Sequence, residues 1–394
     1  MSEWKKVRLG ELCDFINGGA WSDKEYAPEG IPVLKVTNCK NSGFSLSELS
    51  YLPYSLEQKY IQNKLQRNDV IIATVGSHPN LVNSSAGRSV IVNSFVEGFY
   101  LNQNAVCIRT KDEEILNQLF WGYYSKYYLF QNYIQMRGKG AANQMRIAIS
   151  AIKDYPMPLP PINFQRHIAS ILSRYDSLIE NYQKQIKLLE EAAQRLYKEW
   201  FVDLRFPGHE NTNIVDGVPE GWDKKKVGEV IAKVPRSKQI PTKDYQNEGA
   251  IPIIDQSRDY IAGYTDDIES MVESNEPYIV FGDHTRILKY VPFPFAKGAD
   301  GTQLIMSNNL DLMPQCLLFT SLVSVDLSNY SYARHFKYLK EEEILVPTAS
   351  IANAFSKHVA KWYAKIQLNR EQLRFLTEAR DRLLPKLMSG EITV

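Results

Sequence analysis

The sequence predicts an α+β fold that is built twice. We expect two globular domains separated by two long helices that form an antiparallel coiled coil, with a pseudo-two-fold internal repeat. Three observations lead to this prediction. A short motif near the N-terminus returns in mid-chain, two long segments carry the same heptad pattern, and prolines mark the junctions between globular and helical segments. At 394 residues, the chain is long enough for two such domains.

The opening motif of the chain is repeated in its middle. Residues 4–12 read WKKVRLGEL and residues 222–230 read WDKKKVGEV, so both fit W-x4-[LV]-G-E-[LV] at an offset of 218. A second echo relates Ile31–Leu34 to Ile251–Ile254. A weaker third relates Gly-Ser-His at 76–78 to Gly-Asp-His at 282–284, each after an apolar, strand-like run. Such a repeat predicts two copies of one structural unit.

The strongest echo lies in the helical segments. Residues 186–196 and 373–383 share the pattern [IL]-x2-L-x-E-A-x2-R-L at an offset of 187. Because this offset is smaller than the offset of 218 near the N-terminus, the second copy is shorter by about thirty residues. We assign the loss to loops of its globular part.

Both helical segments place apolar residues at alternating steps of four and three, which is the period of a coiled coil. In the first segment every such position is apolar or aromatic: Ile168, Leu172, Tyr175, Ile179, Tyr182, Ile186, Leu189, Ala193, Leu196 and Trp200. In the second segment only Asn369 and Arg380 break the pattern of Phe355, Val359, Trp362, Ile366, Leu373, Leu376, Leu383 and Leu387. A helix of about 40 residues is about 60 Å long.

The common period favours packing of the two helices against each other. The alternative is two ordinary amphipathic helices packed on separate cores. A lone polar core residue such as Asn369 commonly fixes the register of a coiled coil. The pattern alone leaves parallel and antiparallel pairing open. The duplication favours antiparallel pairing, because that arrangement relates the two halves by a pseudo-two-fold axis.

Proline and glycine suggest the domain boundaries. We expect globular domains over 1–160 and 220–348, long helices over 161–206 and 349–394, and a linker over 207–219. A proline-rich stretch over 156–161 closes the first domain and opens its helix. Pro385 is expected to break the second helix near its end. Within the first domain, 68–74, 89–93 and 105–110 look like strands, and 113–136 has a helical pattern.

Composition restricts the classes of protein to consider. No apolar run reaches the ~20 residues of a membrane-spanning helix, and the N-terminus lacks the apolar stretch of a secretory signal, so we expect a cytoplasmic protein. The four cysteines are scattered and form no C-x-x-C pair, which indicates small buried residues. The net charge is +1, so any grip on nucleic acid needs local positive charge or help from partners.

Signatures of catalysis are absent from the sequence. It contains no G-x-G-x-x-G, Walker A, G-x-S-x-G or H-E-x-x-H pattern. Glu57 and Lys59 form an E-x-K triplet, but no aspartate partner is evident, and we interpret the triplet as fortuitous. The sequence therefore predicts a protein that is not an enzyme, with no catalytic residues and no metal site.

The candidate binding residues are polar, planar and located in loops. Arg reads guanine and Asn or Gln reads adenine through paired hydrogen bonds, while Lys and Arg also hold phosphates. We expect DNA contacts in the first domain from Ser77, His78, Asn80, Arg88, Lys139, Asn143, Gln144 and Arg146. The second domain offers Asp283, His284, Thr285, Arg286, Lys297, Thr302, Gln303, Tyr332, Arg334 and His335. Solvated loops carry such residues too, which is the alternative interpretation.

Taken together, these features resemble the specificity subunit of a type I restriction–modification system. The resemblance covers essentially the whole chain. It rests on the two openings at 4–12 and 218–230, on PLPP-x3-QR-x-I at 158–168, and on LLPKLMSGEI at 383–392. AFSKH at 354–358 departs from the QR-x-I of the first helix, and the SHPN loop at 77–80 is no obvious match to the Gly/Thr-rich loops common in the family.

The resemblance implies two target-recognition domains that read a bipartite site in double-stranded DNA, with the paired helices as a spacer. It also implies two modification subunits that methylate adenine with S-adenosylmethionine, and restriction/translocase subunits that use ATP and Mg. No cofactor is then expected in this chain. Two other classes stay open: a coiled-coil scaffold for protein interactions, and a self-sufficient DNA-modifying enzyme. The bases recognised and the gap between half-sites do not follow from the sequence.

Overall fold

The computed structural model describes residues 4–40, 43–46, 49–77, 85–140, 145–330 and 334–392. The chain divides into two compact units. Unit 1 comprises Met1–Asn181 and Leu373–Val394, and unit 2 comprises Tyr182–Gln372. Each unit therefore combines one globular domain with the first part of the long helix that follows it and the last part of the other long helix.

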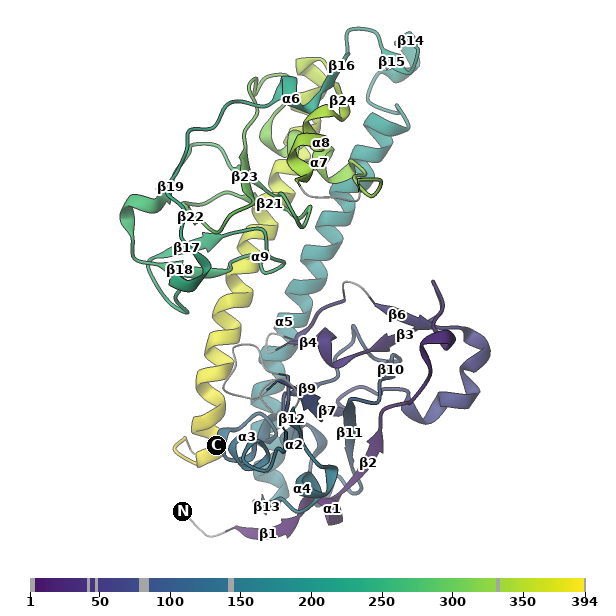
Figure 1. Cartoon of the computed structure of the whole chain (residues 1–394), viewed down its shortest axis with the longest axis vertical. Helices are drawn as coiled ribbons and strands as arrows, with labels where there is room; N and C mark the ends of the chain where they lie inside the picture. The colour runs from purple at the N-terminus through teal and green to yellow at the C-terminus, as the bar shows by residue number, and fades with distance from the viewer. Residues whose placement is uncertain are drawn as a thin grey trace. The chain divides into compact units, whose positions relative to one another are not determined.

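Unit 1 has a four-stranded main sheet of order β2-β11-β7-β9 and a smaller sheet of order β10-β3-β6, while β1 pairs with β13. Its elements (Figure 1) are β1 (Lys5–Arg8), α1 (Leu9–Leu12), β2 (Cys13–Asn17), β3 (Ile31–Leu34), β4 (Cys39–Lys40), β5 (Gly43–Phe44), β6 (Ser50–Leu52), β7 (Val70–Ala73), β8 (Val75–Gly76), β9 (Ser89–Ile91), β10 (Tyr100–Leu101), β11 (Ala105–Thr110), α2 (Gln118–Tyr124), α3 (Tyr128–Gln135), β12 (Met145–Arg146), α4 (Ile149–Lys153), β13 (Pro156–Leu159) and the start of α5 (Ile162–Tyr197).

Unit 2 has sheets of order β18-β17-β22-β19 and β21-β20-β23, while β16 pairs with β24. After the end of α5, its elements are β14 (Ile214–Val215), β15 (Val218–Pro219), β16 (Asp223–Lys226), α6 (Val227–Val230), β17 (Ile251–Ile254), β18 (Gly263–Thr265), β19 (Met271–Val272), β20 (Tyr278–Gly282), β21 (Leu288–Val291), β22 (Phe295–Lys297), β23 (Thr302–Ile305), α7 (Gln315–Ser324), α8 (His335–Glu341), β24 (Glu343–Val346) and the start of α9 (Ala349–Ser389).

The two units share one topology, which confirms the predicted internal repeat. The antiparallel trio β9-β7-β11 corresponds to β21-β20-β23. The trio β10-β3-β6 corresponds to β22-β17-β18, and in both the central strand has one parallel and one antiparallel neighbour. The central strands of this second pair of trios, β3 and β17, are the repeated Ile-Pro segments.

The repeated opening motif has a common packing role. Leu9 and Val227 are fully buried at the starts of α1 and α6. The glycine that follows each lies against a helix: a Cβ on Gly10 would lie 3.0 Å from the Cβ of Lys153, and one on Gly228 would lie 3.1 Å from the carbonyl oxygen of Lys340. The motif therefore keeps a small residue where a short helix meets α4 or α8.

A pair of glutamines also has equivalent roles in the two units, although the sequence patterns did not reveal it. The side-chain amide of Gln118 donates to the carbonyl of Ile108, and its oxygen accepts from the amide of Thr110. Gln315 makes the same two kinds of bond, to the carbonyl of Ile305 and from the amide of Ser307. Each glutamine thus joins the first turn of α2 or α7 to the end of a strand, β11 in unit 1 and β23 in unit 2.

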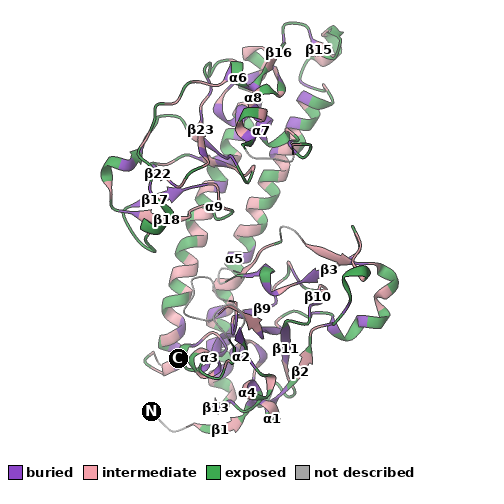
Figure 2. Cartoon of the chain, viewed as in Figure 1, coloured by how far each residue is buried: buried purple, intermediate pink, exposed green. Residues whose placement is uncertain are grey.

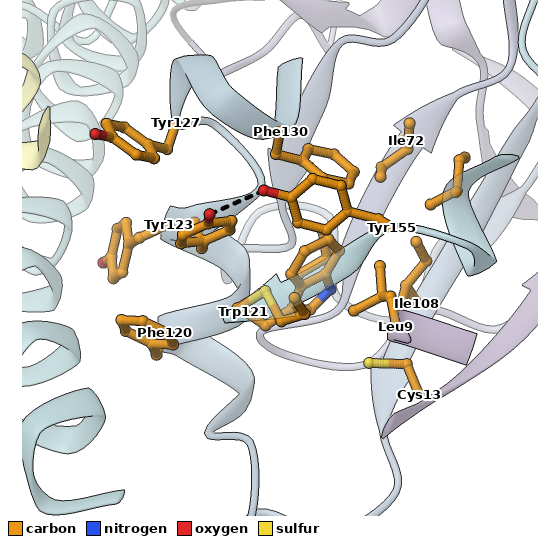
Figure 3. Close-up of a cluster of buried hydrophobic side chains, with 14 of the residues drawn as sticks. Leu9, Cys13, Ile72, Ile108, Phe120, Trp121, Tyr123, Tyr127, Phe130 and Tyr155 are labelled. Carbon is orange, nitrogen blue, oxygen red and sulfur yellow. Dashed lines mark hydrogen bonds between the residues drawn. The ribbon is translucent and has the colours of Figure 1, made fainter. Parts of the chain in front are cut away.

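The core of unit 1 is rich in aromatic side chains from α2 and α3 (Figure 3). Trp121 and Phe130 meet edge to face with ring centroids 5.1 Å apart, and both are fully buried. The hydroxyls of Tyr124 and Tyr155 share a hydrogen bond of 2.9 Å within this core. The same cluster includes Ile168 of α5 and Leu387 of α9, so the globular part and both helices form one core.

Within unit 1 the two long helices pack antiparallel. Asp176 of α5 accepts hydrogen bonds from Arg380 of α9, at 2.6 Å, and from the hydroxyl of Tyr123, at 2.7 Å. The Arg380 side chain is only 13% exposed. A charged group at this heptad position is therefore tolerated because a carboxylate on the other helix neutralises it.

Within unit 2 the same helices pair again, through their other ends. Asn369 is fully buried, and its amide donates to the side-chain oxygen of Gln185 across the helix pair, at 3.2 Å. Arg370 forms an ion pair of 2.9 Å with Glu190. Together with the fold of the two units, this pairing confirms the predicted fold class. Figure 2 shows buried and exposed residues alternating along both helices.

One local expectation differs from the structure, and the structure adds detail to two others. Pro385 does not break α9, which continues to Ser389, because a proline removes one backbone donor but leaves the remaining bonds of the last turns in place. The segment over 207–219 is not featureless and carries a short β14–β15 hairpin. The helical pattern over 113–136 forms two helices, α2 and α3, rather than one.

The four cysteines are free and buried, as predicted. Burial raises the pKa of Cys13 and of Cys39 to about 12, so both are thiols at neutral pH. Among the described residues, no helix is long and apolar enough to cross a membrane. No group of three or more potential metal ligands occurs in that same part of the chain.

Candidate nucleic-acid interface

A polar cavity of about 310 Å³ lies in the globular part of unit 2. It opens among the ends of β20, β22 and β23 and the start of α8. Six of the ten residues predicted to bind DNA in the second domain line it: Asp283, His284, Lys297, Thr302, Gln303 and Arg334. They come from segments as much as 51 residues apart in sequence. Their sequence positions alone did not indicate that they lie together in one cavity.

The wall formed by the loop after β20 has a tight turn. The amide of Gly282 donates to the carbonyl of Ile287, and the amide of Arg286 donates back to Gly282. Arg286 has a φ of 61°, in the left-handed region, and its guanidinium donates to the carbonyl of Tyr330 at 2.7 Å. Arg286 therefore holds the turn in place and does not itself line the cavity.

Gln256 joins the two loops that border the cavity. Its side-chain oxygen accepts from the amide of His284 at 3.1 Å, and its side-chain NH₂ donates to the carbonyl of Asp300 at 2.9 Å. Its own carbonyl accepts from the hydroxyl of Thr285 at 2.7 Å. Gly301 has a φ of 84°, in the left-handed region that favours glycine, and a Cβ there would lie 2.7 Å from the Cδ2 atom of His284. One side chain thus fixes the spacing of both loops.

Lys297 supplies a half-buried positive charge at the end of β22. Burial lowers the pKa of Lys297, and the nearby charge of Asp300 acts in the opposite direction. Among the described residues, its ammonium has no hydrogen-bond or ion-pair partner. Arg334, at the N-terminal edge of α8, adds a second, exposed cation. The cavity therefore offers donors that the described residues leave unsatisfied.

Two of the predicted contact residues have structural bonds instead. Asp283 is buried, and its carboxylate accepts from the amide of Phe336 in the first turn of α8, at 2.8 Å. His335 is also buried, with one ring nitrogen 2.8 Å from the carbonyl of Asp283 and the other 3.2 Å from the carbonyl of Tyr330. His335 therefore orders the cavity wall rather than facing a ligand.

In unit 1 the described candidates lie near β8 and β12. These strands pair through Gly76 with Met145 and Val75 with Arg146. The backbones of Lys139 and Arg146 exchange two hydrogen bonds, of 2.9 and 2.8 Å, and both side chains are exposed. Ser77 directly follows β8, so three predicted residues occupy one edge of the unit.

Arg88 differs from the other unit 1 candidates because it is half-buried. Its guanidinium donates to the carbonyl of Cys39 at 2.5 Å, and burial lowers the pKa of Arg88. It connects two loops of unit 1. The remaining predicted residues lie outside the described part of the chain: His78, Asn80, Asn143, Gln144 and Tyr332.

Sequence reasoning missed several residues of the cavity. Gln239, Asp300 and Gly301 line it, and Gln256 supports it. The glycine-marked run over 298–301 was the only available signal for two of these residues, because no pattern relates Gln239 or Gln256 to the others. The E-x-K triplet is accounted for by ordinary ion pairs, since Lys59 binds Glu25 at 2.7 Å and Glu57 lies 3.6 Å from Lys64.

The chain thus combines two related α+β units, paired long helices within each unit, and a polar, cation-bearing cavity in unit 2. Residues 1–191 match the family described as the type I restriction modification DNA specificity domain. We therefore assign residues 1–191 to this family, in agreement with the resemblance noted in the sequence.

Individual relatives agree with this assignment. The type I restriction enzyme MjaIX specificity subunit of Methanocaldococcus jannaschii is 30% identical over 272 residues, which cover 62% of each chain. The putative MjaX specificity subunit of the same organism is 21% identical over 412 residues, covering 100% of this chain and 94% of the relative. The chain thus spans less than two thirds of the first relative and most of the second.

A solved structure has a similar fold. The crystal structure of a type I restriction–modification S subunit from M. genitalium superimposes with a TM-score of 0.56 at 19% identity, covering 98% of this chain and 96% of that one. At this identity the similarity concerns the fold, which agrees with the duplicated α+β units and long helices described above.

Proposed function

We propose that this protein is the DNA specificity subunit of a type I restriction–modification complex, and that it is a recognition subunit rather than an enzyme. The observation that carries the proposal is the cavity of unit 2, which gathers six predicted DNA-contact residues into one polar site. Its lining provides hydrogen-bond donors and acceptors of the kind that read base edges in the major groove.

We further propose that each unit reads one half of a bipartite site in double-stranded DNA. The shared topology of the two units supports two readers, and their different loops support two different half-sites. The target-recognition domains are then 1–160 and 220–348, with spacer helices over 161–206 and 349–394 and a linker over 207–219. The contact set comprises the described candidates other than Asp283, Arg286 and His335, together with His78, Asn80, Asn143, Gln144 and Tyr332.

Partners complete the activity in this proposal. Two modification subunits bring S-adenosylmethionine and the methyltransferase chemistry, and restriction/translocase subunits bring ATP and Mg. The net charge of +1 supports this division, because a chain so nearly neutral needs other subunits to share the phosphate contacts. We place the complex in the cytoplasm, where it has access to DNA.

Mapping of methylated adenines in the host genome, with and without this gene, tests the proposal. We expect one bipartite motif to lose its methylation when the gene is deleted. An unchanged methylation pattern would contradict the proposal, and it would favour a coiled-coil scaffold with no role in DNA recognition.

A further inference from the structure

The cavity of unit 2 has a lining that distinguishes among base pairs. Among the described residues, its lining side chains are all polar or charged, and Gly301 is the only residue without a side chain. Cations and carboxylates are both present. Such a combination can match one base pair better than the others, because each base pair presents its own order of donors, acceptors and methyl groups in the major groove.

The carboxylates argue against a phosphate as the ligand. Asp283 and Asp300 both line the cavity that contains Lys297. A phosphate would face these like charges within one small site, and their repulsion would offset the attraction of the cations. A neutral base edge has no such conflict, since its own donors and acceptors can match both kinds of group.

The unpartnered ammonium of Lys297 favours guanine over adenine. Guanine presents two acceptors, N7 and O6, whereas adenine presents one acceptor beside an NH₂ donor that would point at the cation. Arg334 can donate to the same acceptors. Thymine would also bring a methyl group, and the described lining has no apolar side chain to receive it.

Asp300 suits the other base of the same pair. The carboxylate of Asp283 already accepts from the backbone amide of Phe336, whereas Asp300 is exposed at the cavity, with its backbone held by Gln256. Cytosine presents an N4 amino donor in the major groove, which a carboxylate accepts. Donors for guanine and an acceptor for cytosine therefore stand in one cavity.

We infer that the unit 2 cavity reads a guanine–cytosine base pair in the half-site of unit 2, with Lys297 and Arg334 donating to guanine and Asp300 accepting from cytosine. The inference rests on the proposed function. It assigns a chemical class of base pair to one site and names the residues that discriminate it.

Selection from a random duplex library tests the inference, with the full-length chain used alone and in complex with its methyltransferase subunit. The variants are Lys297→Met, which keeps an unbranched side chain one atom shorter and removes its charge, and Lys243→Met as a matched control. Lys243 is an exposed lysine of the same unit that does not line the cavity. Replacing the selected guanine by 7-deazaguanine removes N7 without disturbing base pairing.

We expect a bipartite motif in which Lys297→Met lowers the preference for one G·C pair roughly tenfold, the order that one base contact contributes. The other half-site and the Lys243→Met variant should keep their preferences, and 7-deazaguanine should weaken binding of the unmodified protein more than that of Lys297→Met.

Three results would overturn the inference while leaving the proposed function intact. They are a unit 2 half-site made only of A·T pairs, a G·C preference that survives Lys297→Met, and an equal loss of affinity for all sequences, which would identify a phosphate contact. Failure to enrich any sequence, alone or in the complex, would instead contradict the proposed function itself.

Discussion

At the scale of single residues, the structure separates side chains that face the cavity from those that shape it. Lys297 and His335 were both predicted as DNA contacts, yet Lys297 has an unused ammonium and His335 has both ring nitrogens against carbonyls. Residue type alone does not distinguish the two roles. The distinction depends on which backbone carbonyls the fold brings within reach.

Gln256 is the opposite case, a residue that shapes the cavity and that the sequence did not indicate. Its partners, His284 and Asp300, lie 28 and 44 residues away in sequence, so no local pattern could indicate it. Gln256→Glu keeps the size of the side chain but replaces its donor with a carboxylate oxygen that faces the carbonyl of Asp300. We expect affinity for the specific site to fall about tenfold, the cost of one unsatisfied, repelled bond, as measured by DNA-binding titration.

The first half-site provides an internal control for Gln256→Glu. Recognition of that half-site by unit 1 should not change, and the thermal unfolding midpoint should move little. Equal weakening at both half-sites would show that Gln256 supports the whole fold rather than the unit 2 cavity.

The cluster of Asp176, Arg380 and Tyr123 allows a prediction about stability. Asp176→Ala leaves the nearly buried Arg380 with only Asp381, its neighbour on α9, as an ion-pair partner. Losing one charged hydrogen-bond partner at a buried site destabilises a protein by about 2 kcal/mol. Chemical denaturation should show this loss of free energy of unfolding. The double change Asp176→Leu with Arg380→Leu should restore most of it, because it buries no unpaired charge. A single variant as stable as the original would show that the ion pair is not needed.

At the scale of elements, the sequence predicted what is periodic and missed what is local. The heptads of α5 and α9 could be found because the same spacing recurs over many turns. Pro385 was misjudged because Leu384 and Leu387, on either side of it, are buried in the unit 1 core. Their burial offsets the cost of about 3 kcal/mol that a proline adds inside a helix. The glutamine pair of α2 and α7 escaped notice because a single residue type carries no period.

The two long helices are proposed to act as a spacer that sets the distance between the recognised half-sites. Because α5 and α9 each contribute residues to both units, a heptad can be inserted into each at the unit boundary without changing which face is apolar. Seven residues add about 10 Å of helix, so the gap between the recognised half-sites should lengthen by about three base pairs. Methylation mapping or DNA selection measures the gap, and an unchanged gap would contradict the spacer role.

At the scale of the whole molecule, duplication is the main feature. Its two openings and its Ile-Pro strands predicted the shared topology of the units, and the family assignment agrees with it. The differences between the units could not be predicted. At one pair of equivalent helix positions, unit 1 has Asp176 bonded to Tyr123, whereas unit 2 has Tyr363 bonded to Thr320. Substitutions of this kind make the copies similar in fold and distinct in detail.

The central claim is that one chain reads two different half-sites at once. Binding of the full-length protein, in complex with its methyltransferase subunit, to four duplexes tests this claim most directly. The duplexes carry both half-sites, the first alone, the second alone, or neither. We predict tight binding only to the duplex with both, and near-nonspecific binding to the other three, because each lost base pair costs about 1–3 kcal/mol. Equal binding to all four duplexes, or full affinity for a single half-site, would contradict the claim.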